Sequence, residues 1–256
     1  MATTLARPVN NALYDTLGER WYAADDDPVA LLRAESRLRN PWVLEHIRAR
    51  LGASARVLDV GCGAGFLSNY LAANALEVEG IDASAESLAV AQRHDASGSV
   101  RYVLGDALAL PYADASFDAV CAMDFLEHVE DPEKVVAEAS RVLRPGGLFF
   151  FHTFNRNPVA WLIVIKGVEW FVRNTPADMH VLRLFLKPSE LQRFCGRAQL
   201  RTIALHGSSP VIWSRAFWRM LLTRVVPPDF RFQFTRSTLL AYTGYCERLS
   251  CAELGA

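Results

Sequence analysis

Apolar and polar positions divide the chain into short apolar runs and longer amphipathic stretches. The short runs predict strands at residues 56–61, 76–82, 100–106, 117–124 and 148–154. The stretches between them have helical spacing and predict helices at residues 66–74, 83–95 and 131–144, the last followed by Pro145, Gly146 and Gly147. Strands that alternate with helices in this way form right-handed βαβ units, so we expect a mostly parallel sheet with helices on both faces.

The flanking regions lack this regular alternation. Residues 10–50 read as helical, with a break at which Asn40 caps a new helix and Pro41 is its first residue. Beyond the fifth strand, the pattern predicts helices at 158–176, 187–200 and 214–226, and strands at 200–207 and 239–248. We therefore expect a seven-stranded α/β sheet within a domain at residues 51–256. A helical segment at 1–50 precedes this domain, and a helical cap is inserted at 157–195.

Composition and charge exclude several classes of protein. The formal net charge is −1 and the basic residues are dispersed, which argues against a nucleic-acid partner. The five cysteines form no CxxC pair, which is typical of a reducing compartment. The first residues do not resemble a secretory signal, and no apolar run is long enough to span a bilayer. We expect a cytoplasmic protein of unknown oligomeric state.

The stretch VLDVGCGAGFLSNYL carries the first chemical signal. Glycines at positions 61, 63 and 65 follow a strand and precede a helix, so backbone N–H groups can approach a ligand closely. A dinucleotide site requires the spacing GxGxxG, whereas this loop has GxGxG with Asp59 inside the strand. That carboxylate would repel a pyrophosphate but suits a cationic amine.

Acidic residues also end the next two strands. Asp82 stands where a carboxylate can bind both hydroxyls of a ribose, and Asp106, with Ala107 and Leu108, can meet an adenine. Adenine, ribose and an ammonium group without a phosphate describe S-adenosylmethionine. The alternative is that the glycines only form a tight turn.

The motifs VLDVGCGAG, SFDAVCAMDFLEHVEDP and RVLRPGG resemble those of class I S-adenosylmethionine-dependent methyltransferases over about residues 55–155. The resemblance implies a Rossmann-like sandwich and a methyl donor bound at the glycine loop. Its expected cofactor-binding residues are Asp59, Gly61, Cys62, Gly63, Gly65, Asp82, Ala83, Asp106, Ala107, Leu108 and Met123.

A narrower likeness covers about residues 40–195. MDFLEHVEDPEKVV, FFFHTFNRNPVAWLIVIKGVEWFVRNTP and FLKPSEL resemble the ubiquinone-biosynthesis O-methyltransferases, which methylate catechol-type hydroxyls of polyprenylated rings. The resemblance implies a small-molecule acceptor, such as a lipid-soluble quinol. Residues 208–235 have no counterpart in that family, so methylation of another small phenol, sugar or amine stays open. A third hypothesis is a cofactor-binding subunit that has lost catalysis.

The segment Asp124, Glu127, His128 lies just past the fourth strand, at the edge where α/β sheets bind ligands. The family resemblance implies that these three residues hold a divalent cation, which would lower the pKa of the acceptor hydroxyl. We expect His128 to be the catalytic base, with Glu127 beside it. The alternative is that Glu127 and His128 cap the next helix.

Expected substrate-contacting residues come from the fifth strand and the insertion that follows: His152, Asn155, Arg156, Trp161 and His180. A buried structural histidine and a loop-tethering arginine are the alternatives for His152 and Arg156.

The aromatic segment at 158–172 can be a substrate cap, an ordinary buried helix or an interfacial helix. The last of these would place the protein peripherally at the inner face of the membrane. One departure from the family concerns a cofactor-contacting arginine, whose position is Val43 here. Arg37 or Arg39 can substitute for it, or the cofactor's carboxylate is held differently.

Overall fold

The computed structural model describes residues 11–176 and 179–250. Its core is an eight-stranded sheet in the order β3-β2-β1-β4-β5-β8-β6-β7. β1 to β5 pair in parallel, whereas β8 is antiparallel to β5 and β6, and β7 is antiparallel to β6. The strands are β1 (Arg56–Val60), β2 (Glu77–Asp82), β3 (Arg101–Leu104), β4 (Phe117–Met123), β5 (Leu143–Phe154), β6 (Leu200–Pro210), β7 (Phe232–Thr235) and β8 (Ala241–Arg248).

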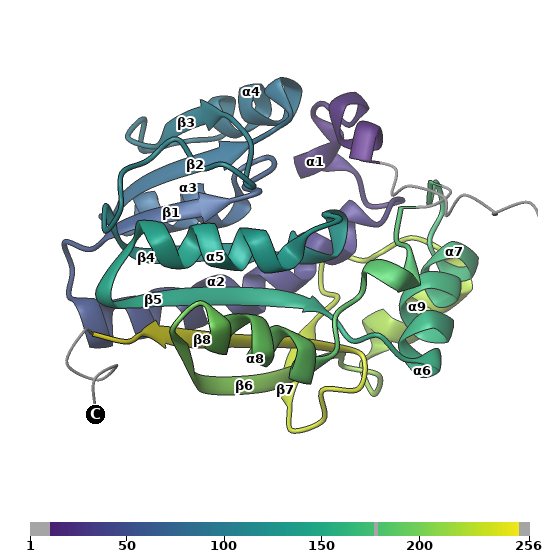
Figure 1. Cartoon of the computed structure of the whole chain (residues 1–256). Helices are drawn as coiled ribbons and strands as arrows, with labels where there is room; N and C mark the ends of the chain where they lie inside the picture. Colours follow the sequence, from purple (N-terminus) through teal and green to yellow (C-terminus); the bar gives the residue numbers. More distant parts are fainter. Residues whose placement is uncertain (1–10, 177–178, 251–256) are drawn as a thin grey trace, which may run out of the picture.

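Helices cover both faces of this sheet (Figure 1). The α-helices are α1 (Arg20–Ala23), α2 (Val29–Leu51), α3 (Phe66–Ala73), α4 (Ala85–Arg93), α5 (Pro132–Val142), α6 (Pro158–Ala160), α7 (Val168–Phe171), α8 (Pro188–Arg197) and α9 (Arg215–Thr223). Single turns of 3₁₀ helix lie at Leu126–His128 and Leu182–Leu184, a longer one at Asn11–Thr16, and a π-helical stretch at Trp161–Gly167.

Alternation along the fifth strand separates two apolar layers. Phe149 and Phe151 pack with α5 and α8, whereas Phe150 packs with α2 and α3. Successive side chains of a strand point to opposite faces, so this run of three buried phenylalanines supplies both layers. The predicted Rossmann-like α/β sandwich is confirmed.

The number of strands differs from the prediction by one. Residues Phe232–Thr235 form β7, which extends the sheet beyond β6. Four residues are too few to show a clear apolar alternation, so sequence pattern alone gave no signal for this edge strand.

The expected helix break at Pro41 is also wrong. α2 runs without interruption from Val29 to Leu51, with Pro41 inside it. An internal proline costs a helix about 3 kcal/mol, but Val43 and Ile47 on the same helix are fully buried against the sheet. Nδ2 of Asn40 donates to the carbonyl of Phe66 instead of capping a helix. Tertiary packing outweighs the local preference here.

The order of strands reverses between β1 and β4. β2 and β3 follow on one side of β1, and β4 and β5 on the other. Ligands of open α/β sheets bind at the carboxyl edge of such a switch point, where two successive loops leave in opposite directions. In this chain Asp59 and Asp124 mark that position.

The helical insertion lies beyond the carboxyl ends of β4 and β5, where α6, α7 and α9 gather at one end of the molecule (Figure 1). Val172, Ala216, Met220, Val226 and Phe230 pack with α2 in a small apolar cluster. Residues 157–176 therefore pack with the C-terminal segment, although the two are distant in sequence. The predicted domain boundary at residue 50 stays a prediction, and residues 1–10, 177–178 and 251–256 of the predicted segments lie outside the described residues.

Candidate active site

A cavity of about 880 Å³ lies at the switch point. Its walls come from the first 3₁₀ helix, α2, the β1–α3 loop, the ends of β2 and β4, the insertion and residues 208–232. Pockets for small ligands usually measure roughly 300–1,000 Å³. The cavity thus joins the glycine loop to the insertion within one space.

The β1–α3 loop is shaped by its glycines. Gly61 has φ +68°, and a Cβ atom there would lie 2.1 Å from Cδ2 of Phe125. Gly65 is the N-cap of α3 with φ +78°, and a Cβ atom there would lie 2.3 Å from the hydroxyl of Tyr102. Gly61 keeps the backbone open toward the cavity, whereas Gly65 serves the packing of α3.

Two carboxylates stand beside this loop, that of Asp59 buried and that of Asp82 partly buried. Oδ2 of Asp59 accepts a hydrogen bond from the hydroxyl of Ser68 at 2.6 Å, and burial raises the pKa of Asp59 to about 7. Asp82 accepts hydrogen bonds from the backbone N–H groups of Gly63 at 2.8 Å and Ser84 at 2.9 Å, and burial raises its pKa too. Both line the cavity, so they form an environment that favours a cation.

The structure brings together most of the predicted cofactor residues. Those that line the cavity are Asp59, Gly61, Cys62, Gly63, Asp82, Ala83 and Met123. The cavity lining, as far as the chain is described, does not include the other four predicted residues, Gly65, Asp106, Ala107 and Leu108. Oδ1 of Asp106 instead accepts from the backbone N–H of Leu108 at 2.8 Å, in the turn after β3. The predicted adenine end is therefore not part of the cavity as it stands.

His128 lines the cavity and Glu127 does not. Nε2 of His128 is 3.4 Å from the hydroxyl of Tyr14, and its Nδ1 has no hydrogen-bond partner among the described atoms. Burial lowers the pKa of His128 to about 4, so the imidazole is neutral at pH 7. Glu127 is fully buried, where its Oε2 accepts from the hydroxyl of Thr153, and burial raises its pKa to about 8.

Asp124 forms an ion pair with an arginine of α2. Nη1 of Arg39 donates to Oδ1 of Asp124 at 2.8 Å, and Nη2 donates to Oδ2. The Arg39 side chain is almost completely buried and lines the cavity. Burial alone would raise the pKa of Asp124, but the adjacent guanidinium holds it below its usual value.

The predicted cation ligands Asp124, Glu127 and His128 do not fit a metal ion. Both oxygens of Asp124 bind Arg39, and Glu127 points into the protein interior toward Thr153. Within the described residues, the only group of three with metal-ligand spacing is Glu35, Asp124 and His152. The geometry gives no support to a cation on the predicted three.

His180 is the only predicted substrate residue in the cavity lining of the described part of the chain. Its ring lies 5.4 Å from that of His128, and burial, followed by the effect of His128, lowers its pKa to about 3. His152 is fully buried behind Glu35 and Asp124, with Nδ1 2.6 Å from the hydroxyl of Thr243.

The other three predicted substrate residues lie outside the described cavity lining. Nδ2 of Asn155 donates to the carbonyl of Thr238. Arg156 pairs with Glu190 and donates to the carbonyl of Arg183, which ties the loop after β5 to α8. Trp161 is 41% exposed and is outside the described cavity lining.

Sequence reasoning missed several residues of the cavity wall. Glu35 and Tyr14 line it, as do Ile212, Phe217 and Leu221 from the segment without a family counterpart. The signal for Glu35 and Arg39 is their four-residue spacing, which places two charged side chains on the same face of α2 as the buried Val43. Arg37, by contrast, donates to the carbonyls of Pro228 and Phe230, away from the cavity.

Comparison with known proteins agrees with this geometry. Residues 58–151 match the family model described as a methyltransferase domain. A ubiquinone biosynthesis O-methyltransferase from Azoarcus sp. is 38% identical over 208 residues, covering 80% of this chain and 87% of its own. The chain belongs to the ubiquinone biosynthesis O-methyltransferase family of S-adenosylmethionine-dependent methyltransferases.

Another member of this methyltransferase family, from Sodalis glossinidius, is 36% identical over 207 residues, covering 78% of this chain and 81% of its own. The fold matches magnesium protoporphyrin IX methyltransferase from Synechocystis with bound S-adenosylhomocysteine, at a TM-score of 0.58 and 16% identity. The aligned part covers 83% of each of these two chains. At that identity the likeness concerns the fold alone.

Proposed function

We propose that this methyltransferase transfers the methyl group of S-adenosylmethionine to a phenolic or catechol hydroxyl of a polyprenylated quinone precursor. The observation that carries the proposal is the continuity of the cavity. It extends from Asp59 and Asp82, which suit a cationic nucleoside, to Leu162, Ile163 and Phe171 in the insertion, which suit an apolar chain. The relatives that share most of the chain are named as O-methyltransferases of ubiquinone biosynthesis.

The transfer is a direct displacement. The bond from the methyl carbon to sulfur breaks as a bond to the acceptor oxygen forms, and the hydroxyl proton passes to His128. The cofactor supplies the leaving group, so the protein must align the reactants and remove the proton. His128 is neutral at pH 7, so its ring can take up that proton; burial makes it a weak base, and the hydroxyl becomes acidic enough only as its oxygen bonds to the methyl carbon.

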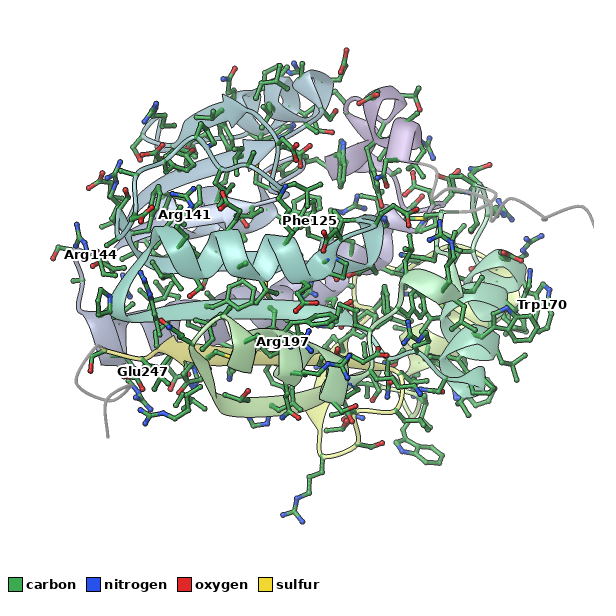
Figure 2. The ribbon with its side chains drawn as sticks, viewed as in Figure 1. Phe125, Arg141, Arg144, Trp170, Arg197 and Glu247 are labelled. Atoms are coloured by element: carbon green, nitrogen blue, oxygen red, sulfur yellow. The ribbon has the colours of Figure 1, made fainter. Side chains whose placement is uncertain are left out.

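The same proposal places the protein at a membrane surface. Val159, Trp161, Leu162, Ile163, Trp170 and Phe171 of the insertion are exposed, as are Ile212, Trp213, Trp218 and Leu222 in or before α9. Trp170 projects from the end of the molecule opposite Arg144 (Figure 2). Several of these residues also line the cavity, so an apolar acceptor can enter from a bilayer at this end.

Charge around these residues matches an anionic lipid surface. Residues 208–236 contain five arginines and one aspartate, whereas the whole chain has a formal net charge of −1. Basic residues near a bilayer contribute about 1 kcal/mol each to binding anionic lipids. Among the described residues, no helix is both long and apolar enough to cross a membrane.

The mass of the methylated product tests the function. The protein is incubated with S-adenosylmethionine that carries a deuterated methyl group and with a panel of acceptors: polyprenyl catechols of increasing chain length, an unprenylated catechol, a flavonoid and an aromatic amine. We expect label on the catechol oxygen, with kcat/KM rising with prenyl length. Exclusive labelling of the amine or the flavonoid would refute the proposed acceptor and favour a different small-molecule methyltransferase.

A further inference from the structure

Four polar side chains meet in the protein beside the end of β4. Glu35 and Arg39 lie on successive turns of α2, Asp124 follows β4, and His152 lies on β5. The ligand atoms of Glu35, Asp124 and His152 all lie within 4.8 Å of one another. Nε2 of His152 is 3.5 Å from each carboxylate and has no hydrogen-bond partner in the described part of the chain.

Without Arg39 this group would suit a divalent cation. Two carboxylate oxygens and an imidazole nitrogen form a donor set that Mn²⁺ accepts. The side chains of Glu35 and Asp124 are largely buried, and that of His152 is completely buried. Water would therefore compete little with the protein ligands. The geometry of a cation site is present in the fold.

Arg39 engages one of the carboxylates that such a cation would need. Its two terminal nitrogens each donate to a different oxygen of Asp124, so this carboxylate has both oxygens engaged. A guanidinium cannot lose its charge at physiological pH, and a planar fork matches a carboxylate in two places. A second cation beside it would compete with the guanidinium for the charge of Asp124 and would be repelled by it at short range, with little solvent between them.

We infer that Arg39 takes the place of a divalent cation on Asp124, the one carboxylate that this group shares with the predicted cation ligands, and that this methyltransferase works without a metal. The fixed charge lies in the cavity wall. Nε of Arg39 is buried without a hydrogen-bond partner among the described atoms. As the acceptor loses its proton, the guanidinium stabilises the developing negative charge on oxygen, as a cation would. Only this last step depends on the proposed function, because metal binding can be measured without an acceptor.

The inference is tested by Mn²⁺ binding to the purified protein. Binding is measured as the decrease in the electron paramagnetic resonance signal of free Mn²⁺. We expect no specific binding to the wild-type protein. Arg39→Met removes the charge at nearly constant volume and should create a site, and Arg39→Met combined with Asp124→Asn should abolish it. Arg37→Met is the matched control, since Arg37 lies on the same helix but binds backbone carbonyls. It should create no site.

Two outcomes would overturn the inference. One is Mn²⁺ binding by the wild-type protein that disappears in Asp124→Asn. The other is an Arg39→Met protein that retains the wild-type circular dichroism spectrum yet binds no Mn²⁺. Arg39→Lys keeps the positive charge, so it should bind no Mn²⁺ and serves as the second variant if Arg39→Met fails to fold.

Turnover gives a separate readout of the charge. Wild-type activity should survive dialysis against EDTA unchanged. Arg39→Met should lower kcat about a hundredfold, as the loss of one oxyanion-stabilising donor does, and Arg39→Lys should restore part of it. Loss of wild-type activity in EDTA with recovery in Mn²⁺ would contradict metal independence. If no acceptor is methylated at all, the proposed function fails while the binding result still decides the inference about Arg39.

Discussion

The hydroxyl of Tyr14 lies 3.4 Å from Nε2 of His128, and the two rings meet edge to face. Tyr14 belongs to the 3₁₀ helix at Asn11–Thr16, which contributes to the wall of the cavity. The contact holds the imidazole from its Nε2 side, and its buried Nδ1 has no hydrogen-bond partner among the described atoms. We propose this histidine as the acceptor of the hydroxyl proton.

His128→Ala should therefore lower kcat by about 10²- to 10⁴-fold, which is the usual contribution of a general base. The affinity for S-adenosylmethionine, measured by isothermal titration calorimetry, should stay nearly the same, because Asp59 and Asp82, and not His128, are the residues that we propose to hold the cofactor. Tyr14→Phe should have a smaller effect on kcat in the same direction. A parallel loss of cofactor affinity and turnover in His128→Ala would contradict a catalytic role.

Cofactor binding should depend on pH through Asp59. Burial raises the pKa of Asp59 to about 7 in the free protein, so the carboxyl is largely neutral below that pH. The ammonium of S-adenosylmethionine requires the charged form. Affinity should thus be constant just above pH 7 and fall about tenfold for each pH unit below it, with release of a proton on binding.

Calorimetry in buffers of different ionisation enthalpy measures both the affinity for S-adenosylmethionine and the number of protons released on binding. Asp59→Asn provides the control, since it removes the titrating group and should flatten the pH profile. Its affinity should approach that of the wild-type protein at acidic pH. An unchanged slope in this variant would assign the titration to another group, such as Asp82, whose pKa is also raised by burial.

Local sequence patterns predict the central fold and the cofactor loop because both depend on short-range features. Each strand–helix unit within residues 56–154 shows its own apolar pattern. The glycine spacing after Asp59 likewise lies within one strand, one turn and one helix. Most of the predicted cofactor residues accordingly line the cavity. The adenine end at Asp106 is the exception, because its carboxylate accepts a hydrogen bond within the turn after β3 and does not line the cavity.

The acceptor end could not be predicted in the same way. Arg39 and Asp124 are 85 positions apart, and Glu35 and Ser208 are 173 positions apart, yet both pairs are in contact. Such contacts depend on how α2 crosses the sheet, and the Asn40–Pro41 pair gave a misleading local signal about that helix. Similarly, α9 contributes to the cavity only because it packs beside α7, which no spacing rule anticipates.

Gly61→Ala should abolish cofactor binding. A Cβ atom at this position would lie 2.1 Å from the ring of Phe125, and φ is +68°, so either the loop or the ring must move into the cavity. Gly98→Ala is a matched control, since Gly98 has φ +61° with nothing within 4 Å of a built Cβ atom. Both variants place a side chain at positive φ and should lose stability, measured by thermal unfolding, and Gly61→Ala should lose more because its Cβ atom also meets Phe125. Only Gly61→Ala should lose affinity in calorimetry, and equal affinities would contradict a close approach of the cofactor to Gly61.

Vesicle sedimentation should show binding to lipid that depends on α9 and the loop before it. Trp213 is 85% and Leu222 86% exposed, and arginines lie among these apolar side chains. The protein should sediment with vesicles that contain phosphatidylglycerol but far less with pure phosphatidylcholine, and salt should weaken the binding. The double variant Trp213→Ser/Leu222→Ser should lower the bound fraction severalfold, because these side chains can enter the lipid interface. Leu104→Ser is the control, since Leu104 is 61% exposed on β3, far along the sheet from α9.

Two results would show that this surface does not dock on an anionic bilayer. One is an equal loss of bound fraction in the double variant and in Leu104→Ser, and the other is equal binding of the wild-type protein to both kinds of vesicle.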